Sequence, residues 1–192
     1  MIIFKLNGII NLMSIKEILE YAKSLVGIKY TWWKEGSTTK EIYPFYVDTV
    51  PSMEYIEKHG INCTGLINLL RQMAGKDIPG KGIYRGGTDQ WYKFLKKKKV
   101  LHKFDDSHKY PKSTLFLRKY RSVEDQGHVA IYITESKHKN KPLYGEIIHA
   151  HFAHNEVEKN GVEITSFGWS HFWIPEGYYE YAILPNDWLS LE

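Results

Sequence analysis

The sequence predicts an α+β protein in which helices come first and an antiparallel sheet follows. Three segments within the first hundred residues carry apolar side chains at helical spacing. Beyond residue 110, five segments rich in β-branched and aromatic residues are separated by charged or glycine-bearing stretches. Helices and strands do not alternate along the chain, which argues against a parallel sheet. The 192 residues contain no internal repeat or long linker, so we expect one domain at 14–192, preceded by an extension at 1–13.

The first helix is predicted to begin after Ser14. Ser14 and Glu17 have the spacing of a capping box, in which each side chain accepts a hydrogen bond from the backbone N–H of the other residue. Gly27 is expected to end the helix, and its apolar face comprises Ile15, Ile18, Leu19, Ala22, Leu25 and Val26. Residues 34–60 carry glycines and prolines among polar side chains, so we expect a long loop with little regular structure there.

The second helix carries the sole cysteine of the chain. It is predicted over about 62–74, with Asn62 as N-cap, Gly75 as stop signal and apolar or small residues at 63, 66, 67, 70 and 73. A third helix is expected to be capped by Thr88, and its apolar face comprises Trp91, Phe94 and Leu95. The strands are expected at 114–118, 128–134, 144–152, 161–165 and 178–184.

Composition limits the classes of partner. The net charge of +4 is mildly basic, and the run Lys96–Lys99 suits a solvated helix end, where cations are favoured. No aromatic interleaving or nucleic-acid motif accompanies this run, so we expect no nucleic-acid binding. No segment has the features of a membrane-spanning helix or a signal peptide, so we expect cytoplasmic synthesis and no integral membrane association. A single cysteine excludes an intrachain disulfide.

Cys63 is the first candidate for a chemical role. A thiol in the first turn of a helix lies near the positive end of the helix dipole and near unpaired backbone N–H groups. Both favour the thiolate, so we expect the pKa of Cys63 to be lowered and the residue to be a nucleophile. The alternative is that Cys63 is a small buried apolar residue, because free cysteine is among the most buried residue types.

Two histidine positions suit the partners that a nucleophilic cysteine needs. His128 follows Gly127 at the start of a predicted strand, where it can face a site from a rigid support. His149 and His151 share one face of the next predicted strand, so either could hydrogen-bond His128 across the ladder. We expect His128 to take the thiol proton and the second histidine to fix its tautomer.

The same histidines allow a different interpretation. His149, His151 and His154 together offer three imidazoles, which is a plausible ligand set for zinc or another borderline metal. No aspartate or glutamate lies within that segment, however, and Cys63 would be left without a role. We therefore predict no metal site, and we interpret His151 and His154 as exposed polar residues.

At this point six motifs, in order between about residues 16 and 174, together resemble the NlpC/P60 family of papain-like cysteine peptidases and amidases. The helix end and aromatic stretch at 22–32 resemble the family's entry segment, Gly-x-Pro-Tyr-x-Trp. Asn62-Cys63-Thr64-Gly65-Leu66 resembles Asp-Cys-Ser-Gly-Leu, and 127–132 resembles Gly-His-Val-Gly-Ile-Tyr. The remaining matches are Ile78-Pro79-Gly80 with Thr88-Asp89-Gln90 and Val100, the segment 111–116, and Ile148-His149-Ala150.

The resemblance implies a papain-like NlpC/P60 fold, with N-terminal helices, including the cysteine helix, packed on a five- to six-stranded antiparallel sheet. It implies that Cys63 is the nucleophile, His128 the base and His149 the orienting group. It also implies that Tyr30 lines the cleft near the oxyanion or the substrate. The reaction typical of the family is hydrolysis of an amide in a bacterial cell-wall peptide, and it requires no cofactor.

The chain departs from the family pattern on the substrate side of this site. Asn62 stands where wall endopeptidases use an aspartate to bind a substrate amine, so it keeps the capping role without the charge. Thr64 stands where serine is usual, and with Asn62 it is expected to contribute to substrate binding. The loop at 34–60 is longer than usual and could cover the cleft. Two alternatives stay open: a lipid ester or amide substrate, as in other relatives, and a non-enzymatic metal-binding module. Some relatives are carried by phages or viruses, which leaves the site of action open.

Overall fold

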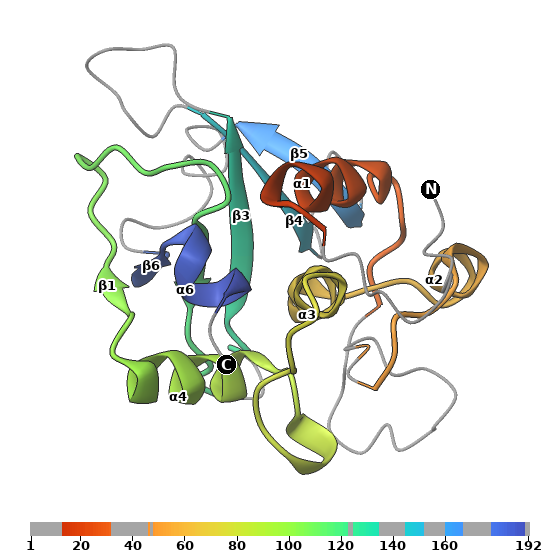
Figure 1. The fold of residues 1–192 in the computed structure, drawn as a ribbon, viewed down its shortest axis with the longest axis horizontal. Coiled ribbons are helices and arrows are strands. Elements are labelled where there is room, and N and C mark those ends of the chain that lie inside the picture. The colour runs from red at the N-terminus through yellow and green to blue at the C-terminus, as the bar shows by residue number, and fades with distance from the viewer. Residues whose placement is uncertain are drawn as a thin grey trace.

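The computed structural model describes residues 13–31, 46, 48–122, 125–134, 145–151, 160–166 and 178–190 (Figure 1). The helices in these residues are α1 (Ile15–Ser24), α2 (Met53–His59), α3 (Cys63–Met73), the short 3₁₀ helix η1 (Gly82–Tyr84), α4 (Thr88–Lys98) and α6 (Pro185–Leu189). The strands are β1 (His102–Lys103), β2 (Leu115–Arg118), β3 (His128–Thr134), β4 (Glu146–His151), β5 (Gly161–Ser166) and β6 (Tyr181–Ile183).

The six strands form one antiparallel sheet in the order β1-β6-β2-β3-β4-β5. The predicted α+β class is therefore confirmed, and the strand number falls within the expected five to six. The register places Arg118 of β2 opposite His128 of β3, and His149 of β4 opposite Glu163 of β5. A register shift between Tyr132 and Thr134 interrupts the pairing of β3 with β4. These pairings position the side chains of the candidate site.

The sheet has two apolar layers, one on each face. The larger layer joins buried side chains of α1, α3, α4 and α6 to side chains from five of the strands. The smaller layer is largely aromatic and comprises Tyr110, Phe116, Ala130, Tyr132, Ile147, Tyr179 and Ala182. Ala130 and Tyr132 share this second layer, as the alternation of β3 predicts for residues two apart.

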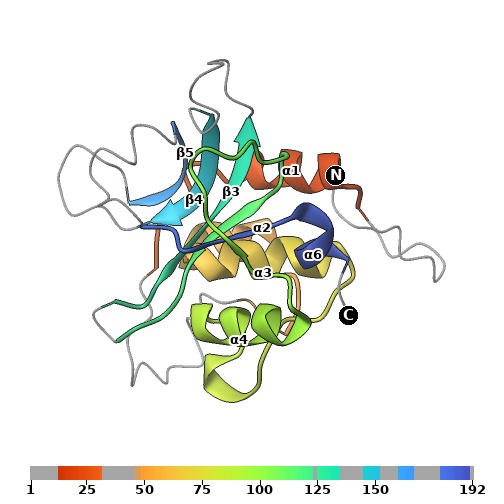
Figure 2. The same ribbon diagram turned by 90° about the vertical axis from the view of Figure 1, so that its left-hand side faces the viewer.

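Helix α3 lies at the centre of the molecule, with α1, α2 and α4 around it (Figure 1 and Figure 2). It contacts β3 and β4 on one side and α1 on another. All of its residues except Gln72 are buried, which is the pattern of a helix enclosed on every side. Cys63 at its first position is therefore held by a rigid, fully packed element.

The capping box of α1 is present as predicted. The hydroxyl of Ser14 accepts a hydrogen bond from the Glu17 N–H at 3.3 Å, and the Glu17 carboxylate accepts one from the Ser14 N–H at 2.8 Å. The predicted apolar face is wider than the buried one, because Ile15 is 39% exposed and Val26 is 46% exposed. The helix ends at Ser24, before the predicted Gly27.

The predicted loop at 34–60 is wrong in its last part, because α2 lies within it. This helix is short, Ser52 caps it, and Ile56 is its one buried residue, so its periodic signal is weak. Thr88 is also misassigned: Gly87 is the N-cap of α4, and the Thr88 hydroxyl donates to the carbonyl of Gln126. Neither β1 nor α6 was predicted from the sequence.

Several sequence predictions fall on residues that the structure does not describe. These are the extension up to residue 12, most of the first half of the 34–60 loop, His154, and the ends of the predicted strand at 144–152. Among the described residues, no helix combines the length and apolar character needed to cross a membrane.

Candidate active site

Cys63 begins α3, and a local hydrogen-bond network fixes the turn that carries it. The side-chain oxygen of Asn62 accepts a hydrogen bond from the Gly65 N–H at 2.7 Å, as an N-cap residue does. The Thr64 hydroxyl donates to the same oxygen at 3.3 Å. Asn62 and Thr64 are both buried, and the capping prediction for Asn62 is confirmed. Contact of either residue with a substrate stays a prediction.

The sulfur of Cys63 lies beside the start of β3. The backbone N–H of Val129, the residue after His128, favours the thiolate by hydrogen bonding, as do the N–H groups of Thr64 and Cys63 itself. Burial nevertheless dominates, and it raises the pKa of the Cys63 thiol to about 11. The predicted lowering of this pKa is therefore wrong for the free protein. The helix start supplies the expected donors, but a side chain that is 7% exposed loses more by desolvation.

His128 is hydrogen-bonded to His149 across neighbouring strands. The Nε2 atom of His128 lies 2.9 Å from Nδ1 of His149, and both side chains are buried. Of the two candidates that the strand pattern left open, it is thus His149 that reaches His128. Burial lowers the pKa of His128 to about 3, with smaller contributions from the charges of His151 and Arg118. Burial also holds the pKa of His149 well below its ordinary value, so both rings are neutral at pH 7.

A second group of polar side chains adjoins the far side of His149. Its Nε2 atom lies 3.2 Å from the Thr165 hydroxyl and 3.9 Å from Oε1 of Glu163. The same carboxylate hydrogen-bonds Nε2 of His151, whose ring stacks on that of His149 with centroids 4.5 Å apart. Glu163 lies on a different strand, so the segment 149–154, which carries these histidines, contains no acidic residue that would indicate it. That reason for predicting no metal site was therefore wrong.

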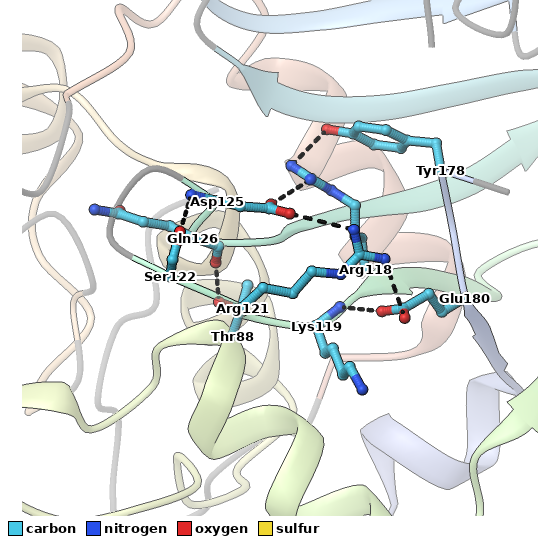
Figure 3. A network of polar contacts seen from close by, with 9 residues as sticks. All are labelled: Thr88, Arg118, Lys119, Arg121, Ser122, Asp125, Gln126, Tyr178 and Glu180. Atoms are coloured by element: carbon cyan, nitrogen blue, oxygen red, sulfur yellow. Dashed lines mark hydrogen bonds and ion pairs between the residues drawn. The ribbon is translucent and has the colours of Figure 1, made fainter. Parts of the chain in front are cut away.

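Arg118 is a charged neighbour of the site that the sequence analysis missed. Figure 3 shows its guanidinium between Asp125, with which it forms an ion pair, and Tyr178. Its carbon Cζ lies 4.3 Å from the centre of the Tyr178 ring, and Nη2 donates to the Tyr178 hydroxyl at 3.4 Å. The charge lowers the pKa values of both Cys63 and His128. Only the strand register, which places Arg118 opposite His128, could have revealed it.

Three tyrosines lie close enough to Cys63 for its charge to affect their pKa values. The pKa values of Tyr30, Tyr178 and Tyr179 are all raised, mainly by burial and in part by the proximity of the Cys63 thiolate. Tyr30 is placed there by a bridge to Ile61, two residues before the cysteine. The structure thus brings Tyr30 to the candidate site, while its role toward an oxyanion or substrate stays a prediction.

The reactivity of the thiol is expected to rise with pH through neutrality. With a pKa near 11, about one Cys63 in ten thousand is ionised at pH 7, and this fraction rises about tenfold with each pH unit. Alkylation by iodoacetamide, followed by intact-mass spectrometry, measures this directly because the chain has one cysteine. A rate that is already maximal between pH 6 and 7 would instead indicate a thiolate stabilised by His128.

Comparison with known proteins gives one weak likeness. No protein-family model matches the chain, and no curated protein matches it. Among solved structures, it is similar to a Staphylococcus aureus protein described as similar to lipoprotein, of the NLP/P60 family. The TM-score is 0.43 and the identity is 15%, with 81% of this chain and 36% of that chain covered. The chain thus spans about a third of the length of that protein, and a likeness this weak assigns no activity.

Proposed function

We propose that the protein is a cysteine hydrolase of the NlpC/P60 type, which cleaves an amide through a thioester intermediate. The observation that carries this proposal is the His128–His149 hydrogen bond of 2.9 Å at the start of β3. The backbone N–H of Val129, the residue after His128, hydrogen-bonds the sulfur of Cys63 there. In this assignment Cys63 is the nucleophile, His128 the general base and acid, and His149 a positioning residue.

The state of the two reacting groups favours proton transfer during attack. Since Nε2 of His128 is held by His149, Nδ1 is the nitrogen left for the thiol. Both groups are neutral at pH 7, because burial raises the pKa of the thiol and lowers that of the imidazole. The sulfur therefore forms its bond to the carbonyl carbon as its proton passes to His128. No long-lived ion pair precedes this step.

The remaining steps follow the usual course of acyl transfer. His128 returns the proton to the leaving amine as the C–N bond breaks, which leaves the acyl group on the sulfur. His128 then takes a proton from water, the hydroxide adds to the thioester, and the Cys63 thiol is restored as the acid leaves. The N–H of Cys63 and the hydroxyl of Tyr30 are the proposed donors to the oxyanion. The N–H begins α3, and Tyr30 lies close enough to Cys63 for the thiolate charge to add to the effect of burial in raising its pKa.

A cell-wall peptide is the proposed substrate class. This assignment rests on the order of six motifs that resemble the family. Asn62 carries no charge and its oxygen is occupied by the cap, so a substrate with a free amine gains no ion pair there. We therefore propose an internal peptide amide rather than one next to a free amino terminus.

The test is mass spectrometry of defined mixtures after incubation with the protein. One mixture contains cell-wall peptides, the other phospholipid vesicles, and each is paired with the Cys63→Ala variant. We expect new peptide termini with the wild type and none with the variant. Release of fatty acid or lysophospholipid by the wild type would assign a lipid substrate instead. Products that form equally with the variant would refute the cysteine mechanism.

A further inference from the structure

We infer that His149, His151 and Glu163 form a binding site for a divalent transition-metal ion such as zinc. One potential ligand atom from each residue lies within 4.8 Å of the other two. Two imidazoles and one carboxylate, with water in the fourth position, make an established ligand set for zinc. The inferred site does not depend on the proposed hydrolase activity, but its effect on catalysis does.

The strand geometry brings these three ligands together without a loop. His149 and His151 are two residues apart on β4, so both rings lie on one face of the sheet. Their planes differ by 14°, and both Nε2 atoms face the same carboxylate oxygen of Glu163. Glu163 is supplied by β5, where it stands directly opposite His149. The scaffold is therefore two paired strands rather than a loop.

The distances require little movement to accept an ion. Ligand atoms at about 2.0–2.2 Å from a tetrahedral zinc lie about 3.3–3.6 Å from one another. Oε1 of Glu163 is 3.9 Å from Nε2 of His149 and in hydrogen-bond contact with Nε2 of His151, so the required separation falls between these two contacts. The ion would displace the hydrogen bond between His149 and Thr165. His151 and Glu163 keep 15% and 24% of their side-chain surface exposed, which gives an ion access from solvent.

A hydrogen bond orients the buried ligand from behind. His149 presents Nδ1 to Nε2 of His128, at 2.9 Å, while its own Nε2 faces the inferred site. Such an outer partner fixes the ring orientation of a metal-bound histidine. Because the same ring would serve the metal and the proposed catalytic histidine, occupation of the site is coupled to catalysis.

The coupling is expected to be inhibitory. A metal on Nε2 of His149 leaves the ring proton on Nδ1, so His149 must donate in its hydrogen bond with His128. During the proposed reaction His128 holds a proton on each nitrogen, and it must donate in that same bond. Two donors cannot share one hydrogen bond, so the metal-bound state opposes proton uptake by His128.

Zinc binding is measured by calorimetry on the untagged Cys63→Ala protein, which removes the thiol as a ligand. We expect one zinc ion per chain. His151→Gln and Glu163→Gln, each added separately, are expected to weaken binding by about a hundredfold or more, since loss of an outer partner alone costs about 10–100-fold. His108→Gln is the matched control, because His108 is exposed on a loop outside the inferred site, and it is expected to bind as its parent does.

Two further readouts keep the outcome interpretable. Circular dichroism shows whether each variant is folded. If either His151→Gln or Glu163→Gln is unfolded, the zinc affinity of the folded variant tests the site. Cobalt bound to the wild type is expected to show the visible bands of a tetrahedral site without a thiolate-to-cobalt band. No stoichiometric zinc binding, or binding that survives both substitutions, would overturn the site.

The effect on catalysis is tested separately, with the substrate that the mass-spectrometry experiment identifies. Zinc is expected to inhibit the wild type, and a chelator is expected to restore the rate. Inhibition of His151→Gln is expected to be weaker, when the rate of each protein with zinc is divided by its own rate without zinc. Zinc bound at the predicted residues without inhibition would overturn the coupling while leaving the site. A protein that binds zinc but cleaves no substrate would count against the proposed hydrolase and not against the site.

Discussion

Replacement of Cys63 by alanine is expected to lower kcat by about ten thousandfold or more, because the variant has no atom that can form the thioester. The measurement is the initial rate of product formation, at a saturating concentration of the substrate that the mass-spectrometry experiment identifies. KM is expected to change little, since the side chain is small and buried within the first turn of α3. Circular dichroism of the variant establishes that the helix is retained.

The same prediction extends to His128, and the two residues are expected to act as a unit. His128→Gln keeps a hydrogen-bonding side chain but cannot carry the proton, so we expect a loss of similar order. The double variant is expected to be no slower than the worse single variant, as found for groups that serve one step. His108→Gln, an exposed histidine substitution, controls for the chemical change and is expected to retain the wild-type rate.

Additive losses would mean that Cys63 and His128 contribute to different steps. Retention of most activity by Cys63→Ala would exclude the thioester mechanism altogether. In that case the buried thiol would be the small apolar residue that the sequence also allowed.

The long elements of the fold could be predicted because each carries its own periodic signal. Helix α3 combines a cap at Asn62, an apolar period and a glycine stop between residues 62 and 75, and β3 is rich in β-branched and aromatic residues. Short elements carry no such signal. Helix α2 buries one residue, and β1 contributes two exposed residues whose pairing with β6 alone makes them a strand.

In the candidate site, too, only the residues that a local sequence pattern places could be predicted. Cys63, His128 and His149 could be nominated because local pattern predicts where each one sits on its helix or strand. The choice of His149 over His151 required the strand register, which the shift after Tyr132 makes unpredictable from sequence. Arg118 and Glu163 were missed for the same reason, since each is a neighbour across a ladder.

The error in the Cys63 pKa has a different physical origin. The local contribution, from backbone donors at the helix start, was correctly identified. Desolvation depends on what the rest of the chain places over the sulfur, and no segment near residue 63 encodes that. For Cys63, the sequence therefore predicts the direction in which nearby backbone donors shift the pKa, but it does not predict the larger effect of burial.

Mild acid is expected to destabilise the protein steeply, because two histidines are buried in their neutral form. The unfolded chain binds a proton at each of them below a pKa of 6.5, whereas burial lowers the folded pKa of His128 to about 3 and that of His149 well below its ordinary value. Folded-state stability is therefore fully present above pH 6.5 and is lost as the pH falls from 6.5 toward 3. Each histidine contributes a slope of up to about 1.4 kcal/mol per pH unit within this range.

The measurement is urea unfolding at several pH values between about 4.5 and 7.5, where the lower limit lies just above the ordinary carboxylate pKa values of about 3.9 and 4.3. At the acid end the expected loss from His128 alone is about 3 kcal/mol, which is a large part of the stability of a typical domain. His128→Gln is expected to remove the contribution of His128 to the slope of stability against pH. The difference in free energy of unfolding between the variant and the wild type is therefore expected to shrink as the pH falls.

His108→Gln again provides the control, because His108 is exposed on a loop and its replacement is expected to leave the slope unchanged. A wild-type stability that stays constant down to about pH 4.5 would mean that His128 and His149 accept protons in the folded state. Proton transfer from Cys63 to a neutral His128, on which the proposed mechanism depends, would lose its physical basis at that pH.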